Sequence, residues 1–198
     1  MNLKVVKMKK KLKREFVEWG ILVLVVSVIY LGGWHTEVLG RLQQVVLSTG
    51  VLSPNELAHK KVASLDFFLE DADGNAVAFK EQEGNVIFLN FWATWCPPCI
   101  AEMPDINDLY NKKNNEASFF LVSVDKDRQK AIDFVKRKQF DFPIYFLNSS
   151  LPSDFDIHSI PTTYLIDKQN NITVENHGMA KYDTEKFRNL ISRLTKAQ

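Results

Sequence analysis

The sequence predicts an α/β domain with a mostly parallel or mixed sheet between helices, spanning residues 61–198 of a 198-residue chain. Two observations lead to this prediction. From about residue 60 onward, apolar segments of strand length alternate with segments of helical periodicity, a pattern typical of sheets covered by helices. The segment "NVIFLNFW", residues 85–92, is almost continuously apolar, as a central strand buried on both faces requires.

The other elements of the domain alternate along the chain. A hairpin is expected first, because strand-like segments at 62–69 and 77–80 flank the turn signal Asp73-Gly74. The elements expected after the central strand are, in order, a helix at about 96–115, a strand at 118–124, a helix at about 128–138, strands at 142–147 and 160–167, the segment 171–178 and a helix at 184–194. Active sites of such sheets gather at the carboxyl ends of strands, and Cys96 lies at one of them.

The charge distribution separates the amino terminus from the rest of the chain. The net charge is only +1, but the first fourteen residues contain seven basic and no acidic residues. The remainder therefore has 18 basic and 24 acidic residues, a net charge of −6. A mildly acidic body gives no reason to propose nucleic acid as a partner.

An apolar run follows the basic start. Residues 19–34 carry no charged side chain, and Phe16 and Val17 extend the run toward bilayer length. We therefore predict a single transmembrane anchor at 16–34, with a basic cytoplasmic terminus at 1–15 and the rest of the chain outside the cytoplasm. A cleaved signal peptide is the alternative, although "LGG" at 31–33 is a weak cleavage site. Both interpretations export the domain.

A connector joins the apolar run to the domain at residues 35–60. Val38, Leu42, Val45 and Val46 are spaced for one face of a helix. Such an amphipathic helix can rest on a membrane surface or against the domain, but a simple spacer helix is the favoured interpretation.

Cys96 and Cys99 are the only cysteines of the chain, and two prolines separate them. A thiol reacts as its thiolate, which the backbone N–H groups and dipole of a helix N-terminus favour. Cys96 lies at an expected helix start, and Cys99 follows one turn later, close enough for a disulfide. Pro97 and Pro98 stiffen this turn, and the backbone N–H groups that prolines lack would have no intrahelical partner at a helix start. We therefore predict that Cys96 is the attacking thiolate and Cys99 the resolving thiol.

The cysteine pair has three alternative interpretations. Zinc needs four ligands, whereas the motif offers two and the four histidines are scattered, so no metal is expected. Free cysteines can pack as inert small hydrophobes, but two prolines at a helix start are poor core residues. A purely structural disulfide is the most serious competitor, yet such bridges usually close longer loops. Redox chemistry is favoured, with the dithiol itself as the redox group and no further cofactor.

The segment "NFWATWCPPCIAEMP" resembles the active-site segment of the membrane-anchored, thioredoxin-like thiol-disulfide oxidoreductases of the TlpA and ResA group. The resemblance covers about residues 62–198. It implies a thioredoxin-like fold, a central mixed sheet flanked by helices, with an added amino-terminal β-hairpin after a single transmembrane helix.

The resemblance also implies roles for particular residues. "SIPTTYLID" matches the segment whose proline is cis opposite the dithiol, which makes Pro161 the cis-proline and Ile160 the residue that meets substrate backbone. Glu102 matches a glutamate beside the redox pair that helps to move protons. Its alternative interpretation is an ordinary acid in the first turns of a helix.

Trp95 and Pro97 are expected to contact substrate beside the dithiol, although packing alone justifies most tryptophans. Asn90 stands where thioredoxin itself has a buried aspartate, so the proton must come from elsewhere, with Glu102 or water as candidates. His158 and His177 are interpreted as structural or surface residues.

The function expected from this resemblance is reduction of disulfides in exported proteins, such as apocytochrome c, with electrons from a membrane partner. The catalytic domain would face the periplasm or the outer face of the membrane. The alternatives are a thiol peroxidase of the same fold and a non-catalytic copper- or haem-delivery module that uses both thiolates as soft ligands.

Overall fold

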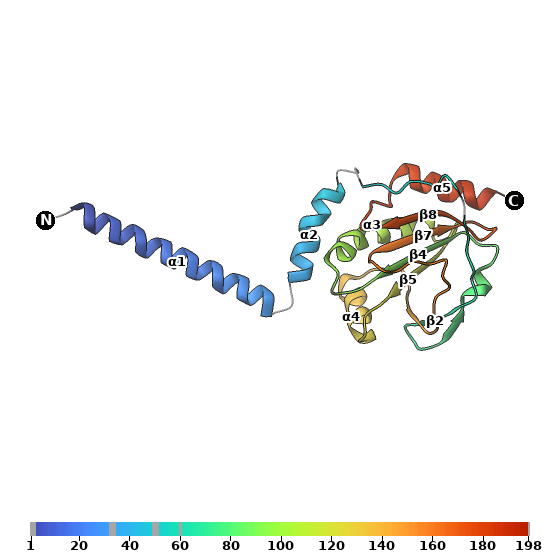
Figure 1. Ribbon diagram of the computed structural model, residues 1–198, viewed down its shortest axis with the longest axis horizontal. Coiled ribbons are helices and arrows are strands. Elements are labelled where there is room, and N and C mark those ends of the chain that lie inside the picture. The colour runs from blue at the N-terminus through green and yellow to red at the C-terminus, as the bar shows by residue number, and fades with distance from the viewer. Residues whose placement is uncertain (1–2, 32–34, 49–51, 60, 198) are drawn as a thin grey trace.

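A computed structural model describes residues 3–31, 35–48, 52–59 and 61–197 (Figure 1). The helix α1 extends away from an α/β domain, and α2 lies against that domain. The elements are α1 (Leu3–Leu31), α2 (His35–Ser48), β1 (Lys61–Val62), β2 (Phe68–Asp71), β3 (Ala76–Ala78), the 3-10 helix η1 (Phe79–Gln82), β4 (Ile87–Trp92), α3 (Pro97–Lys113), β5 (Ser118–Ser123), α4 (Arg128–Lys138), β6 (Ile144–Leu147), β7 (Thr162–Ile166), β8 (Asn171–His177) and α5 (Glu185–Lys196).

The strands form one mixed sheet with the order β1-β8-β7-β4-β5-β6-β2-β3. β4 pairs in parallel with β5 and antiparallel with β7, and all six of its residues are buried. The prediction of a central strand covered on both faces is confirmed. A mixed sheet is confirmed as well, because β4, β5 and β6 are parallel while their neighbours on both sides run antiparallel.

The three helices of the domain pack on one face of this sheet. Phe88 and Trp92 of β4 share a core with buried side chains of α3, α4 and α5. The alternate residues of β4 face a second core that contains no buried α-helical side chain among the described residues. The expectation of helices flanking the sheet on both sides is therefore wrong for the second face. There, η1 and the extended segments 63–67 and 151–157 provide the cover.

The start of the domain shows why a strand was expected at 62–69. Buried and exposed residues alternate from Ala63 to Phe67, as in a strand, but this extended segment lies over the second face of the sheet. Val62 pairs with β8 as part of β1, and the ladder of the hairpin begins only at Phe68, where β2 pairs antiparallel with β3. Asp71 closes the turn between them, because its Oδ1 accepts hydrogen bonds from the amides of Asp73 and Asn75 at 2.9 and 2.8 Å.

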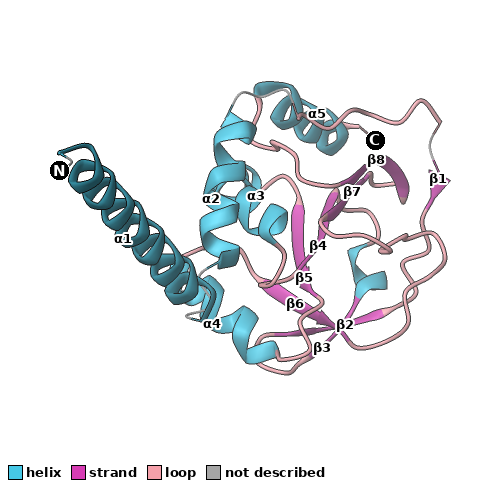
Figure 2. Cartoon of the chain, turned by 60° about the vertical axis from the view of Figure 1, so that its left-hand side comes forward, coloured by secondary structure: helices cyan, strands magenta, loops and turns pink. Residues whose placement is uncertain are grey.

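The connector helix α2 packs on α3, so the interpretation as a simple spacer is wrong (Figure 2). Gly40 is buried at the contact, where a Cβ atom would lie 3.1 Å from Ile100 Cγ2 and 3.2 Å from the Pro97 carbonyl oxygen. Glu37 accepts hydrogen bonds from Arg137 Nη2 at 2.8 Å and Lys138 Nζ at 2.6 Å, at the end of α4. The absence of a side chain at Gly40 lets α2 approach the first turn of α3 closely. The ion pairs of Glu37 with Arg137 and Lys138 hold it there.

Leu42, by contrast, is exposed, while Leu47 is buried. Leu42 is one of the four residues of the predicted apolar face, and the side chains of the other three, Val38, Val45 and Val46, lie outside the described residues.

No helix among the described residues is both long and apolar enough to cross a membrane. The predicted transmembrane anchor at 16–34 is not confirmed, and its residues 32–34 lie outside the described part of the chain.

The close approach at Gly40 makes a testable prediction. Gly40→Leu should destabilise the protein by about 1–3 kcal/mol, because the added side chain must displace Ile100 or the backbone of Pro97. Urea unfolding of the full chain measures this. Gly20→Leu is the matched control, because nothing lies within 4 Å of a Cβ atom at that helical glycine. Equal stability of the two variants would contradict the tight packing of α2 on α3.

Candidate active site

The site forms where the chain leaves the central strand β4 and enters α3. Cys96 is the N-cap of α3, and Pro97 and Pro98 are its first two residues, where no intrahelical N–H partner is needed. The Cys96 sulfur accepts a hydrogen bond from the Cys99 amide at 3.3 Å. The sulfur of Cys96, the nucleophile predicted from sequence, therefore accepts the hydrogen bond that a side-chain oxygen accepts at an ordinary N-cap.

Cys96 and Cys99 form a disulfide with a Cα–Cα distance of 5.3 Å. Cys96 is 3% exposed and Cys99 is completely buried. Cys96 is thus the less buried of the two cysteines, and its role as the attacking residue stays a prediction.

A second loop lies against the disulfide. The Ile160–Pro161 peptide bond is cis, as the resemblance implies. The Ile160 carbonyl oxygen is 3.7 Å from Cys96 Sγ, and the Pro161 carbonyl oxygen accepts a hydrogen bond from the Gly178 amide at 2.8 Å. The predicted residues Cys96, Ile160 and Pro161 are thus brought together from elements more than sixty residues apart.

The two other predicted contact residues lie beside the same sulfur in the chain. Trp95 is 59% exposed, whereas Pro97 is partly buried. An exposed tryptophan next to an almost buried sulfur offers apolar surface to a macromolecular partner.

Glu102 is fully buried on α3, one helical turn after Cys99. Its Oε1 accepts a hydrogen bond from Asn90 Nδ2 at 2.9 Å, and its Oε2 accepts one from the Ala180 amide at 3.1 Å. Burial raises the pKa of Glu102 to about 8, although these two hydrogen bonds act in the opposite direction. The same Asn90 Nδ2 also donates to Thr163 Oγ1 at 2.8 Å. A carboxyl group that titrates near neutral pH therefore lies beneath the dithiol.

Several members of the site escaped the sequence analysis. Asp125, just after β5, accepts hydrogen bonds from the Thr94 amide at 2.9 Å and from Thr94 Oγ1 at 2.6 Å. Ser123 Oγ also donates to this carboxylate, at 2.9 Å. These contacts hold the loop that carries Trp95 and Cys96. The only available signal was the position of an aspartate at the carboxyl end of a strand beside the central one.

The sequence analysis also missed Thr163 and Ala180. They are hydrogen-bond partners of Asn90 and Glu102, and Asn90 was interpreted only as a residue that cannot titrate.

Among the described residues, no group of three or more His, Cys, Asp or Glu side chains is arranged to hold a metal ion.

Known proteins are similar to this chain in sequence and in fold. The family model described as Redoxin matches residues 57–191. The chain is 35% identical over 138 residues to "Thiol-disulfide oxidoreductase ResA" of Halalkalibacterium halodurans, an alignment that covers 68% of this chain and 78% of that protein.

Two solved structures show the same fold. A putative Thiol:disulfide interchange protein DsbE from Chlorobium tepidum is 25% identical with a TM-score of 0.60, and the match covers 69% of this chain and 98% of that one. A putative thiol-disulfide oxidoreductase from Bacteroides vulgatus is 29% identical with a TM-score of 0.56, covering 72% and 97%.

The buried Glu102 predicts a pH-dependent stability. Its pKa is about 8 in the folded protein against an ordinary value of 4.5, so folding retains a proton that the unfolded chain releases. This contribution to stability is fully present below about pH 4.5 and is lost as the pH rises toward about 8. Between about pH 5 and pH 8, Glu102 should lower the free energy of unfolding by something on the order of 2–4 kcal/mol.

Urea unfolding of the oxidised full chain at both pH values measures this loss. Glu102→Gln should remove it, whereas Glu83→Gln, at an exposed glutamate, should keep it. A decline of the same size in Glu102→Gln and in the unsubstituted protein would show that another group is responsible.

Proposed function

This chain belongs to the Redoxin family and is a thioredoxin-like thiol-disulfide oxidoreductase, and we propose that it reduces disulfide bonds of exported proteins through Cys96 and Cys99. The observation that carries the proposal is the cysteine pair itself, a disulfide across the first turn of α3 in which Cys96 is 3% exposed and Cys99 is completely buried. The dithiol supplies both electrons, so the reaction needs no bound metal or cofactor.

The reaction begins with the reduced protein. The Cys96 thiolate attacks one sulfur of a substrate disulfide, forms a mixed disulfide and releases the first substrate thiolate, which takes up a proton. The Cys99 thiolate then attacks Cys96 Sγ, which breaks the mixed disulfide and releases the second substrate thiolate. The substrate disulfide gains two electrons and two protons, and the Cys96–Cys99 pair loses them.

Glu102 is the proposed acceptor of the Cys99 proton. A base works best when its pKa lies near that of the acid it deprotonates, and a pKa of about 8 is close to that of a thiol. Position supports the role as well, because Glu102 and Cys99 are both completely buried one turn apart on α3. Bulk water has no direct access to either group.

Burial of the cysteines favours the direction of reduction. A protein becomes a strong oxidant when its reduced form is stabilised, which usually means a stabilised thiolate. Here the Cys96 sulfur accepts a hydrogen bond from the Cys99 amide, and Cys96 is almost completely removed from water. Desolvation opposes the stabilisation of a thiolate that the N-terminus of α3 provides, so we propose that the reduced form is not strongly stabilised and that the dithiol is an electron donor.

The proposed substrate surface surrounds Cys96. Trp95 supplies exposed apolar area, Pro97 lies beside it, and the Ile160 backbone faces the sulfur. We propose that exported proteins, apocytochrome c among them, bind here. Disulfides persist mainly outside the cytoplasm, so a reductase of such substrates works on the periplasmic or outer side of the membrane. A membrane protein that supplies electrons would regenerate the dithiol.

Attachment to a membrane is proposed through α1. Phe16, Trp19, Leu22 and Leu24 of this helix are all more than half exposed. Apolar side chains that no other part of the described chain covers can be buried in lipid.

Cysteine substitutions test the proposed roles. Cys99→Ser should accumulate a mixed disulfide between Cys96 and a disulfide-containing peptide, because the resolving thiol is missing. Cys96→Ser should form none, because Cys99 is buried. Mass spectrometry under non-reducing conditions measures both. Trapping through Cys99 would reverse the roles, and trapping by neither variant would contradict a reductase.

A lysine in α1 tests the attachment. Leu24→Lys should lower binding of the full chain to phosphatidylglycerol vesicles by at least roughly tenfold, because a charge is costly in lipid. Leu42→Lys is the control, since Leu42 of α2 is also 64% exposed. Flotation with the vesicles measures the bound fraction. Equal binding of the two variants would contradict attachment through α1.

A further inference from the structure

Asn90 links the buried Glu102 carboxyl to the central sheet. It lies in β4 and is completely buried. Its Nδ2 donates hydrogen bonds to Glu102 Oε1 on α3 at 2.9 Å and to Thr163 Oγ1 on β7 at 2.8 Å. The two N–H groups of this amide thus have one partner each, and the Glu102 carboxyl is tied to the sheet through Asn90.

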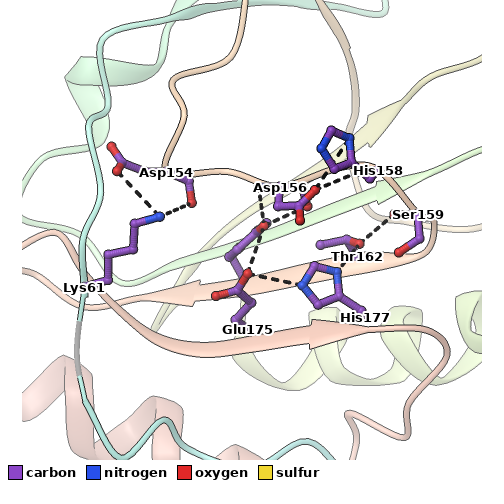
Figure 3. A network of polar contacts seen from close by, with 9 residues as sticks. Lys61, Asp154, Asp156, His158, Ser159, Thr162, Glu175 and His177 are labelled. Atoms are coloured by element: carbon purple, nitrogen blue, oxygen red, sulfur yellow. Dashed lines mark hydrogen bonds and ion pairs between the residues drawn. The ribbon is translucent and has the colours of Figure 1, made fainter.

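Thr163 is a fixed anchor for the Asn90 amide. It is the cross-strand partner of Asn90 in the ladder between β4 and β7, and it is completely buried. Its neighbour Thr162 points to the opposite face of β7, where Oγ1 donates to the Ser159 carbonyl oxygen at 2.7 Å (Figure 3). Because β7 is held on both faces, its hydrogen bond with Asn90 fixes the orientation of the amide that faces Glu102.

The carbonyl group of the same amide is destabilising where it lies. Asn90 Oδ1 is buried, and no described group donates a hydrogen bond to it. A leucine has nearly the same shape as an asparagine and would avoid a buried carbonyl oxygen without a partner. What a leucine lacks is the pair of N–H donors, so the contribution specific to Asn90 is its hydrogen bonds to Glu102 and Thr163.

The hydrogen bond from Asn90 favours the ionised form of Glu102. A hydrogen bond donated to a carboxylate is roughly twice as strong as one donated to a neutral acid, so this donor stabilises the carboxylate more than the acid. The Ala180 amide acts in the same direction on Oε2. Since Ala180 donates through its backbone, Asn90 is the donor of the two that a substitution can remove.

The titratable groups around Glu102 do not replace this donor. Asp105, one turn further along α3, opposes the ionisation of Glu102 through its like charge, and Lys181 acts on Asp105. Tyr182, in the loop before α5, is completely buried, and burial raises its pKa well above the ordinary value, so it carries no charge. Cys99, one turn earlier on α3, is neutral both in the disulfide and as a thiol. Burial and Asp105 are therefore opposed by the two hydrogen bonds to Glu102.

We infer that Asn90 is a positioning residue for the proposed proton transfer: its amide ties the Glu102 carboxyl to the sheet and favours the form that accepts the Cys99 proton. The inference rests on the proposed function. In the resolving step the S–H bond of Cys99 breaks and the proton forms an O–H bond on Glu102. The Cys99 sulfur then bonds to Cys96 Sγ, and the substrate sulfur leaves as a thiolate. Asn90 acts on this step through Glu102.

The decay of a mixed disulfide tests the inference. The reduced full chain is mixed with a peptide that contains one disulfide, and mass spectrometry of acid-quenched samples gives the formation and decay of the Cys96–peptide disulfide. In Asn90→Leu the decay should be about three- to tenfold slower at about pH 7, because less of Glu102 is ionised. At about pH 10 the variant and the unsubstituted protein should agree within about twofold. Formation should agree within about twofold at every pH.

Asn111→Leu is the matched control. Asn111 is an exposed residue of α3 whose Nδ2 donates to Asp141 Oδ2 at 3.0 Å, so the same substitution removes the same kind of hydrogen bond away from the site. Its decay rates should equal those of the unsubstituted protein. A decay in Asn90→Leu that is slowed by the same factor at every pH would overturn the inference, because a merely structural asparagine would act in that way. An unchanged decay would overturn it as well.

A titration of the oxidised full chain does not need turnover. The carbon-13 signal of the Glu102 carboxyl, assigned by its absence in Glu102→Gln, reports the ionisation of this group. Its midpoint should lie about one pH unit or more higher in Asn90→Leu, the size expected for one lost hydrogen bond to a charged group. Asn90→Ala removes the same donor without adding volume and should give the same shift, so the test does not depend on the folding of the leucine variant.

The titration separates the inference from the proposed function. An unchanged midpoint in the Asn90 variants would overturn the inference, even in a protein that reduces peptide disulfides. A raised midpoint in a protein that reduces no peptide disulfide would support the hold of Asn90 on Glu102 while contradicting the proposed function.

Discussion

The structure depends on one hydrogen bond, in which the Cys99 amide donates to the Cys96 sulfur at the start of α3. Through it, the same sulfur caps the helix and carries the chemistry. The sulfur follows β4, the strand that pairs with both β5 and β7. The loop between β4 and Cys96 is held by Asp125, which accepts a hydrogen bond from the Thr94 amide. The reactive atom therefore follows a strand whose six residues are all buried.

The Glu102 carboxyl is a buried polar group on α3, one helical turn after Cys99. Glu102 is tied to β4 by Asn90 and to the loop before α5 by Ala180, and Asn90 continues to Thr163 of β7. A buried carboxyl costs stability when it is charged, which is why burial moves its pKa to about 8. The same cost makes Glu102 suited to exchange a proton with a buried thiol. Stability and proposed function are linked through this one residue.

Local sequence was enough for the parts of the fold that one segment determines. The apolar run 85–92 predicted the central strand, and the cysteine spacing with its prolines predicted the capped disulfide. The cis-proline came from resemblance, since no local pattern distinguishes it from a trans one. What failed depends on contacts between distant segments. Residues 63–67 have the alternation of a strand but cover the sheet face, and α2 docks through Gly40, a residue with no side chain to show in a periodicity. The partners of Glu102 and Thr94 lie 12 to 78 residues away, beyond any spacing rule.

We propose that the pair, with Cys96 and Cys99 both buried and the Glu102 carboxyl one helical turn further along α3, acts as an electron donor. The equilibrium reduction potential of the Cys96–Cys99 pair tests this most directly, measured on the full chain in thiol-disulfide buffers. A buried, weakly stabilised thiolate predicts a potential near that of thioredoxin, roughly −270 mV. A value near roughly −120 mV would mean that the reduced form is strongly stabilised, and the protein would then be an oxidant of exported thiols.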